Sequence, residues 1–184
     1  MKQTVVYLTV LILSGCSSWL PDYSNEDTGA RLILSQALIV PGASARVFIQ
    51  EGKVLPARSF NHYQISCSFE VRQVSEQPQT IEADSFVVNR VQHMQEEIAA
   101  WKKVQLASLN MAGLSGDSSP PDIFRGWHFW LSSEKQPNVL RMTCRGVFAE
   151  PWEAESPTLA EIKDALGAVA DLKIGADAFV PGRF

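Results

Sequence analysis

The sequence lacks the features that mark several large classes of protein. It has no run rich in Lys and Arg, and 16 basic residues stand against 20 acidic ones, which gives a net charge of −4 at pH 7. With a pI of about 5.4, the chain shows no basic segment that would bind the phosphate backbone of a nucleic acid, so no nucleic-acid partner is expected. No apolar run reaches the roughly 20 residues of a membrane-spanning helix. Hydrophobic residues still make up 46% of the 184 residues, a share typical of a globular domain.

Residues with catalytic or metal-binding spacing are scarce as well. The three histidines, His62, His93 and His128, show neither H-E-x-x-H nor His-x-His spacing, so no metal is predicted. Ser132 and Lys135 satisfy S-x-x-K, but the companion motifs are missing and both residues lie near a predicted turn. No dinucleotide fingerprint, Walker sequence or G-x-S-x-G elbow occurs. We therefore predict no cofactor and no catalytic residues, and favour a protein that is not an enzyme.

The first 16 residues differ in character from the rest. An uncharged apolar run over residues 5–13 leads into Leu13-Ser14-Gly15-Cys16. A run of this length, too short to span a bilayer, is typical of a signal peptide. The tetrapeptide resembles the lipobox of bacterial lipoproteins. That resemblance implies cleavage before Cys16, with residues 1–15 removed and fatty acyl groups such as palmitate attached to the cysteine.

Such an anchor would hold the protein on a membrane. Two or more acyl chains anchor stably, since each buried methylene contributes about 0.8 kcal/mol. Ser17 stands where the resembled lipoproteins of the inner membrane carry Asp, which implies the periplasmic face of the outer membrane. Residues 16–30 contain Pro21 and no periodic apolar face, and are interpreted as a lipidated tether. A single globular domain over residues 31–184 follows.

The two remaining cysteines, Cys67 and Cys144, predict a disulfide. An even pair in an oxidising compartment is most simply bonded. Cys67 lies on the apolar phase of the alternating stretch Tyr63–Val71, which predicts a half-buried strand with Tyr63 inward as well. Cys144 has the same phase within Leu140–Phe148. A redox or catalytic thiol is the alternative, but no C-x-x-C is present and the neighbouring arginines should lie on the opposite face.

Short strands separated by turn signals dominate the domain. Pro41-Gly42 divides the apolar runs 31–40 and 45–50, and indicates a hairpin or a bend. Residues 126–132 and 139–148 flank a turn and predict another hairpin. We therefore expect a mainly β (α+β) fold, as a small antiparallel sandwich or barrel-like sheet with one C-terminal amphipathic helix.

Two segments break the strand pattern. Thr158-Leu159-Ala160-Glu161 is a capping-box sequence, and the apolar stripe behind it predicts a helix of about four turns that reaches Lys173. On this interpretation Gly167 lies in mid-helix, where it costs about 1 kcal/mol relative to Ala. Residues 92–109 fit either a helix or the arm of a long β-hairpin, and the sequence leaves both open.

An aromatic run over residues 127–130 supplies the candidate binding surface. On a strand, Trp127 and Phe129 face one side, whereas His128 and Trp130 face the other. One pair can enter the core. The other is covered by the C-terminal helix, is covered by a partner, or is exposed. Trp127, His128 and Trp130 are therefore the candidate contacts for an envelope protein or a glycan.

Together these features predict a lipid-anchored periplasmic lipoprotein that serves as a binding or envelope-assembly accessory domain. One alternative is an envelope hydrolase acting on peptidoglycan or lipid, whose Ser, His and carboxylate would meet only in the folded chain. Another is a carrier of a small apolar ligand, which would need a cavity within the strands.

Overall fold

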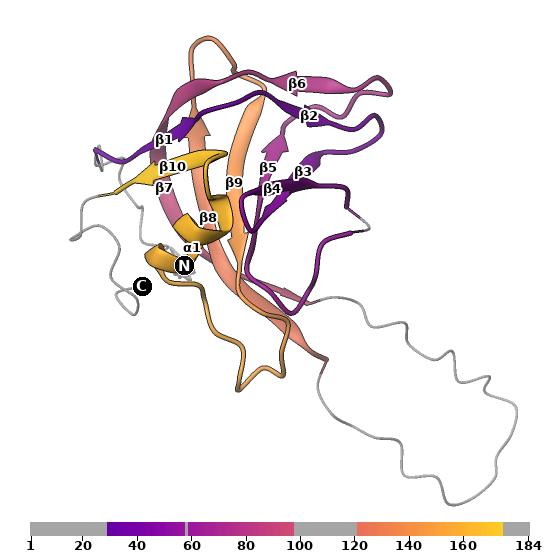
Figure 1. Cartoon of the computed structure of the whole chain (residues 1–184), viewed down its shortest axis with the longest axis vertical. Helices are drawn as coiled ribbons and strands as arrows, with labels where there is room; N and C mark the ends of the chain where they lie inside the picture. The colour runs from indigo at the N-terminus through magenta and orange to yellow at the C-terminus, as the bar shows by residue number, and fades with distance from the viewer. Residues whose placement is uncertain (1–28, 58, 98–120, 175–184) are drawn as a thin grey trace, which may run out of the picture.

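The computed structural model describes residues 29–57, 59–97 and 121–174 (Figure 1). Within them the elements are, in chain order, β1 (Arg31–Leu34), β2 (Leu38–Val40), β3 (Arg46–Gln50), β4 (Lys53–Leu55), β5 (Ser66–Val71), β6 (Gln79–Ile81), β7 (Asp84–Glu97), β8 (Ile123–Ser132), β9 (Val139–Arg145), α1 (Leu159–Leu166) and β10 (Ala170–Lys173). No helix within these three ranges has the length and apolarity to cross a bilayer.

Eight of the strands form one antiparallel sheet in the order β10-β1-β7-β8-β9-β5-β3-β4. The sheet curls into a half-barrel, and α1 lies against its concave side (Figure 1). β2 and β6 pair separately as a two-stranded sheet. The expected mainly β, barrel-like fold with one helix near the C-terminus is therefore confirmed.

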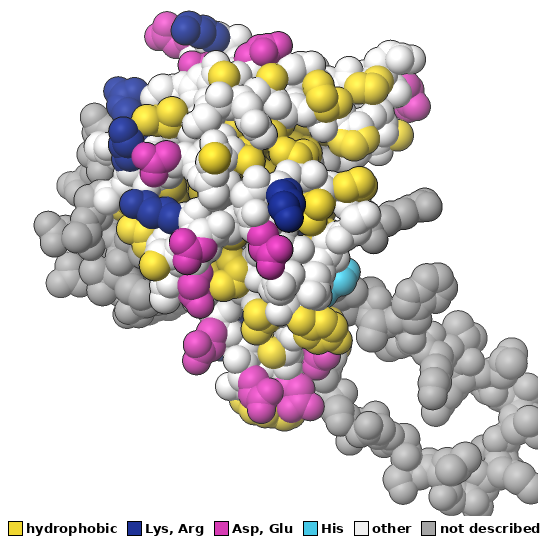
Figure 2. Space-filling model, viewed as in Figure 1, with side chains coloured by type: hydrophobic (Ala, Val, Ile, Leu, Met, Phe, Trp, Pro, Cys, Tyr) yellow, Lys and Arg dark blue, Asp and Glu magenta, His cyan; other side chains and the backbone are white. Residues whose placement is uncertain are grey.

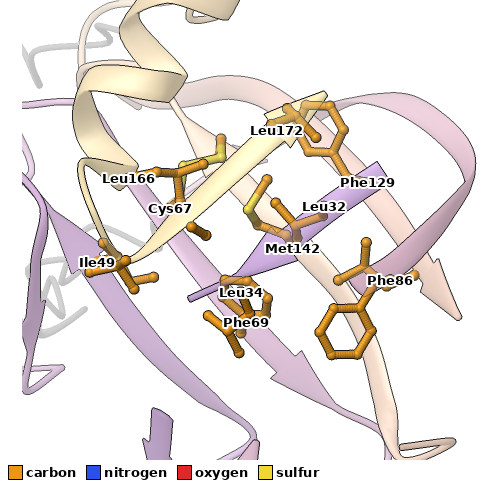
Figure 3. Close-up of a cluster of buried hydrophobic side chains, with 14 of the residues drawn as sticks. Leu32, Leu34, Ile49, Cys67, Phe69, Phe86, Phe129, Met142, Leu166 and Leu172 are labelled. Atoms are coloured by element: carbon orange, nitrogen blue, oxygen red, sulfur yellow. A yellow bond between two sulfur atoms is a disulfide. The ribbon is translucent and has the colours of Figure 1, made fainter. Parts of the chain in front are cut away.

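The core fills the concave side of the sheet. Alternate strand residues point inward and are fully buried, because the pleat sends neighbouring side chains to opposite faces (Figure 3). The helix adds its own apolar stripe to the same cluster. The largest inward side chains labelled in Figure 3 are Phe69, Phe86 and Phe129.

The helix is shorter than the sequence predicts. Its capping box is confirmed, since the Thr158 hydroxyl accepts from the Glu161 amide and the Glu161 carboxylate accepts from the Thr158 amide. It ends after two turns because Gly167 takes φ +54° and ψ −130°, a conformation that L side chains rarely adopt. A Cβ there would also lie 2.6 Å from the Gly52 Cα. The predicted extension to 173 is wrong, because Ala170–Lys173 pairs with β1 as a strand.

Residues 92–97 form part of a strand. They belong to the 14-residue β7, which pairs with β8 as far as Glu97 and Ile123. The helical alternative for residues 92–109 is therefore wrong over 92–97, and the hairpin-arm alternative holds there. The ladder with β8 supplies the backbone hydrogen bonds that a helix would have supplied locally. Residues 98–109 lie outside the described residues.

The two turn predictions have different outcomes. β8 and β9 pair directly, which confirms the hairpin predicted around residues 133–138. Pro41-Gly42 makes a bend, because the strands on either side of it join different sheets. β2 pairs with β6, whereas β3 pairs with β4 and β5. At the β3–β4 hairpin, Glu51 and Gly52 both have positive φ, as a two-residue primed turn requires.

The predicted disulfide is present. Cys67 and Cys144 lie directly opposite each other on β5 and β9, are bonded, and have no exposed surface. The half-buried strand predicted around Cys67 is wrong in two respects. All six residues of β5 are buried on both faces, and Tyr63 is 69% exposed because pairing with β9 begins only at Ser66.

Replacing both cysteines, as Cys67→Ala/Cys144→Ala, should lower the free energy of unfolding by about 2–5 kcal/mol, because the bridge closes a long loop and fills the core. The two residues are 77 apart in sequence. Urea unfolding of the full chain measures the change. Met142→Leu is the matched control, a volume-conserving exchange in the same core that should cost less than about 1.5 kcal/mol. Equal unfolding midpoints for the oxidised wild type and the double variant would contradict the stabilising role.

Candidate functional site on the outer face

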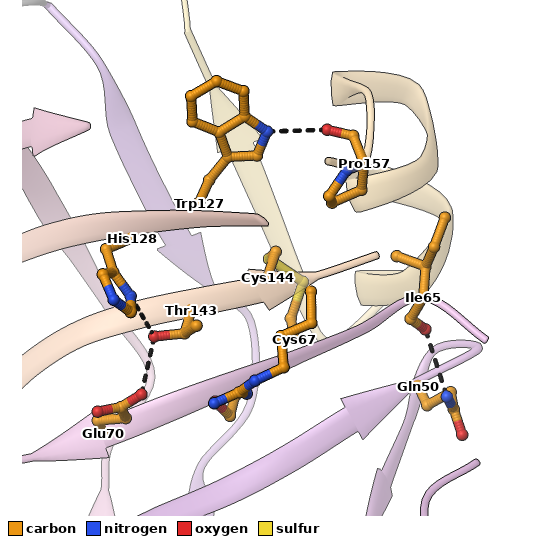
Figure 4. Close-up of a disulfide and its surroundings, with 11 residues drawn as sticks. Gln50, Ile65, Cys67, Glu70, Trp127, His128, Thr143, Cys144 and Pro157 are labelled. Atoms are coloured by element: carbon orange, nitrogen blue, oxygen red, sulfur yellow. Dashed lines mark hydrogen bonds between the residues drawn. A yellow bond between two sulfur atoms is a disulfide. The ribbon is translucent and has the colours of Figure 1, made fainter. Parts of the chain in front are cut away.

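The aromatic run on β8 is divided between the two faces of the sheet, as expected. Trp127 and Phe129 are buried on the concave side, and the Trp127 Nε1–H donates to the Pro157 carbonyl at 3.0 Å (Figure 4). His128 and Trp130 lie on the opposite, outer face and are only partly buried. The interpretation in which the helix covers this second pair is wrong, because α1 packs in the cluster that contains Trp127 and Phe129.

Trp130 lies between two guanidinium groups on the outer face. The Arg90 Cζ is 4.7 Å from the ring centroid and the Arg141 Cζ is 5.2 Å from it. Register explains the arrangement, since Trp130 on β8 lies opposite Arg90 on β7 and Arg141 on β9. Both distances suit cation–π attraction. Gln92 orients the pair, because its Oε1 accepts from the Trp130 Nε1 at 3.1 Å and from the Arg90 Nη2 at 3.0 Å.

A chain of hydrogen bonds runs from His128 to Glu70 (Figure 4), and the His128 ring lies 6.4 Å from the Trp130 ring between centroids. The Thr143 hydroxyl donates to the Glu70 Oε1 at 2.7 Å and lies 2.8 Å from the His128 Nδ1. A carboxylate can only accept, so the single hydroxyl proton of Thr143 is used toward Glu70. The His128 Nδ1 must then carry its own proton and donate it. This fixes the tautomer and leaves the His128 Nε2 with a free lone pair when the ring is neutral.

Glu70 is held in its charged form. Burial raises the pKa of its carboxyl, but the Thr143 hydrogen bond and the positive charges of Arg46 and Arg141 outweigh that effect and lower the pKa below its ordinary value. Arg141 also donates to the Glu70 Oε2 from Nε at 3.0 Å and from Nη2 at 2.9 Å. This paired geometry makes the contact a strong one.

His128 is held in its neutral form. Burial, with the positive charge of Arg141 as the next cause, lowers the pKa of its ring to about 4. Glu70 opposes this shift but does not cancel it. The outer face therefore presents a neutral imidazole beside a cation-flanked indole at neutral pH. We call Glu70, Arg90, His128, Trp130, Arg141 and Thr143 the outer-face cluster.

Four members of the cluster were not among the sequence candidates: Glu70, Arg90, Arg141 and Thr143. They come from β5, β7 and β9, on both sides of β8. Strand alternation could have identified part of this cluster, because it places Arg141 on the face opposite the Cys144 sulfur, where His128 and Trp130 also lie. A neighbouring pair, Arg145 with Glu96 at 2.7 Å, continues the polar network along the same face.

A second histidine contacts a hydroxyl on the concave side. The His93 Nε2 lies 2.9 Å from the Ser156 Oγ, and the ring meets Trp127 edge-on at 5.3 Å between centroids. Burial, then the charge of Arg125, lowers the pKa of His93. Across the described ranges, no acidic side chain hydrogen-bonds to either His93 or Ser156. A nucleophile–base contact is therefore present here without the carboxylate that would orient the base.

The remaining candidates are dispersed. His62 stacks among Phe60, Phe124 and Phe148, far along the chain from His93 and His128. In the part of the chain that the structure describes, no three His, Cys, Asp or Glu side chains gather in a way that could hold a metal. Cys16 lies outside the described residues.

An open hollow of about 530 Å³ lies between α1 and the β3–β4 turn. Its lining includes Glu51, Glu161 and Asp164 beside the apolar Ile65 and Val147. Ligand sites for apolar molecules are instead enclosed and mostly apolar. This hollow therefore does not support the apolar-carrier alternative.

Comparison of the chain with protein-family models, with curated proteins and with solved structures finds no match.

The neutral state of His128 should make stability depend on pH. Below about pH 6.5 the unfolded chain protonates this histidine, whereas the folded chain resists protonation down to about pH 4. The unfolded state then binds more protons, so stability should fall as the pH falls through this window, by at most about 1.4 kcal/mol per pH unit for each such proton.

His128→Asn should make this decline shallower, because Asn can still donate to Thr143 but does not titrate. Urea midpoints measured from pH 7 to pH 4.5 test this. The same substitution at His93, whose pKa is also lowered, should remove a second and independent part of the slope. A His128→Asn profile parallel to that of the wild type would show that His128 is not the responsible group.

Proposed function

We propose that this protein is a lipid-anchored component of the cell envelope, on the periplasmic face of the outer membrane, whose outer-face cluster binds a partner without chemical turnover. The observation that carries the binding role is the partly exposed Trp130 between the guanidinium groups of Arg90 and Arg141. Trp and Arg are the side chains most enriched at the energetic centres of interfaces. An envelope protein or a glycan ring is the partner class that this chemistry fits.

The proposed location in the cell envelope is supported by two observations of different kinds. The lipobox-like sequence at Cys16 supports lipidation and export. The fully buried bridge between Cys67 and Cys144 supports an oxidising compartment, where structural disulfides form and persist. The two agree on the same side of the cytoplasmic membrane.

The hydrogen bonds within the cluster favour binding over catalysis, because they already engage the groups that could act as nucleophile or base. Glu70, Thr143 and the His128 Nδ1 already satisfy one another. The Thr143 hydroxyl is fully buried and its proton is engaged, so it is not available as a nucleophile. What remains toward solvent is the indole, the free sides of the two guanidinium groups and the neutral imidazole. This is a preorganised recognition surface.

A second candidate, an envelope hydrolase, rests on the 2.9 Å contact between His93 and Ser156. In that case Ser156→Ala would abolish hydrolysis of peptidoglycan or lipid substrates and leave partner binding at Trp130 unchanged. The binding proposal predicts the opposite result, in which Trp130 is required for the protein's function and Ser156 is not.

Cys16→Ala should prevent maturation, because Cys16 is the only cysteine of the lipobox-like sequence and supplies the thiol that would accept the diacylglyceryl group. We expect an unprocessed precursor and no labelling by radioactive palmitate, measured by gel mobility and autoradiography in bacterial cells. Ser17→Ala is the matched control and should be processed and labelled like the wild type. Undiminished palmitate label on Cys16→Ala would rule out this anchor.

Partner contact can be tested by placing a photoreactive phenylalanine analogue at position 130 in living cells. We expect a discrete adduct that weakens when Arg141→Gln removes one flanking cation. The same analogue at Trp152, which is 66% exposed, controls for random collisions. An identical adduct pattern from both positions, or none from position 130, would defeat the binding role of this face.

A further inference from the structure

Five cationic side chains cross the outer face of the sheet from one edge region to the other. They belong to β10, β1, β7, β9 and β3, and we call them the basic band: Lys173, Arg31, Arg90, Arg141 and Arg46. The chain as a whole is acidic, with a net charge of −4. The clustering of cations on one face is therefore not a reflection of composition.

Arg31 and Lys173 occupy directly opposite positions on β1 and β10. Both are exposed, whereas the next pair, Leu32 and Leu172, is buried on the concave side. Alternation therefore sends both cations to the outer face, next to each other. Like charges directly opposite on antiparallel strands are destabilising. An anion placed over this pair would relieve the repulsion.

The other three cations lie in one row across the sheet. Arg90, Trp130 and Arg141 are in register on β7, β8 and β9, and the row continues through Glu70 to Arg46. Only Arg141 of the band forms a salt bridge within the described ranges, with Glu70.

Three carboxylates of the described strands share the face with the band: Glu70 in the row, the exposed Asp171 on β10, and Glu96, which pairs with Arg145. With Arg145 counted beside the band, six cations against these three carboxylates leave a local charge of +3. In Figure 2, acidic side chains gather around α1 and at the lower end of the molecule and also lie at the upper edge, whereas Lys and Arg lie mainly along the left margin, near β1 and β10.

The chain enters the domain beside this band. Arg31 is the first residue of β1, and the preceding Ala30 carbonyl accepts from the Val88 amide at 3.0 Å, two residues before Arg90. Cys16 precedes Arg31 by 15 residues, a span of about 50 Å at most. A short connection of this kind raises the effective concentration of a surface near its anchor point, so that weak contacts there suffice.

We propose that the basic band lies against phosphate-bearing lipid headgroups of the membrane that holds the anchor. This inference rests on the proposed lipid anchoring at Cys16. It assigns the domain an orientation, with the β1–β7 side and its cations toward the lipid and the acidic α1 side away from it. Each Lys or Arg near an anionic surface strengthens attraction about fivefold.

The test uses the full chain carrying Cys16→Ala, so that acylation contributes to no arm. The retained residues 1–15 are the same in every variant, so differences between variants report on the domain. Sedimentation measures its partition onto vesicles of phosphatidylcholine and onto vesicles that also contain phosphatidylglycerol. We expect tighter binding to the anionic vesicles, lost at high salt. Arg31→Gln/Lys173→Gln should weaken that preference roughly 10- to 30-fold. Both side chains are exposed, and thermal unfolding verifies that the variant is folded.

Lys135→Gln/Lys163→Gln is the matched control, since it removes two exposed cations from the β8–β9 turn and from α1. It should keep the preference for anionic vesicles. The proposal would be overturned if the protein with an unsubstituted basic band bound both vesicle types equally. It would also be overturned if the control variant lost as much of its preference for anionic vesicles as Arg31→Gln/Lys173→Gln. Displacement by millimolar inorganic phosphate would indicate a soluble phosphate ligand and would overturn it too. None of these outcomes bears on palmitate labelling of Cys16, so the two proposals fail separately.

Discussion

The pairing of β5 with β9 is the contact on which both faces of the sheet depend. On the concave side it places Cys67 against Cys144, and on the outer side it places Glu70 within reach of Arg141 and Thr143. A slip of one residue would send the sulfurs outward and the carboxylate into the core. The covalent bond on one face thus holds the register that the polar network on the other face requires. In turn the network lets a central strand bury charged and hydroxyl side chains without leaving them unpaired.

The two proposals use the same face of the sheet, since Arg90 and Arg141 belong both to the outer-face cluster and to the basic band. A domain held by its amino end, with cations toward lipid, would keep α1 and the acidic hollow away from the membrane. Trp130 sits in the middle of the row that links Arg90 to Arg141. A partner that contacts the indole would therefore do so close to the membrane plane, where only molecules of the envelope surface are in reach. Restricting access in this way is a form of selectivity that needs few contacts.

Local chemistry in the sequence was sufficient for some elements and insufficient for others. The capping box at Thr158 and the pair of cysteines are signals that their own neighbours define, and both predictions are confirmed. The end of the helix was mispredicted because Gly167 is fixed by its close approach to Gly52, over a hundred residues away in the chain. The cation pair around Trp130 depends on register between distant strands. Neither the Gly167–Gly52 approach nor the cation pair can be read from hydrophobic periodicity, because periodicity indicates only which residues share a face.

The order of strands has a consequence for how the molecule is made. β1 lies between β7 and β10, so the first strand of the sheet obtains its second neighbour only from Ala170–Lys173. A growing chain cannot complete that edge until residues 170–173 have been made. Pairings of such long sequence separation form late and slowly. Closure of this edge is therefore a late event that the strand order itself imposes.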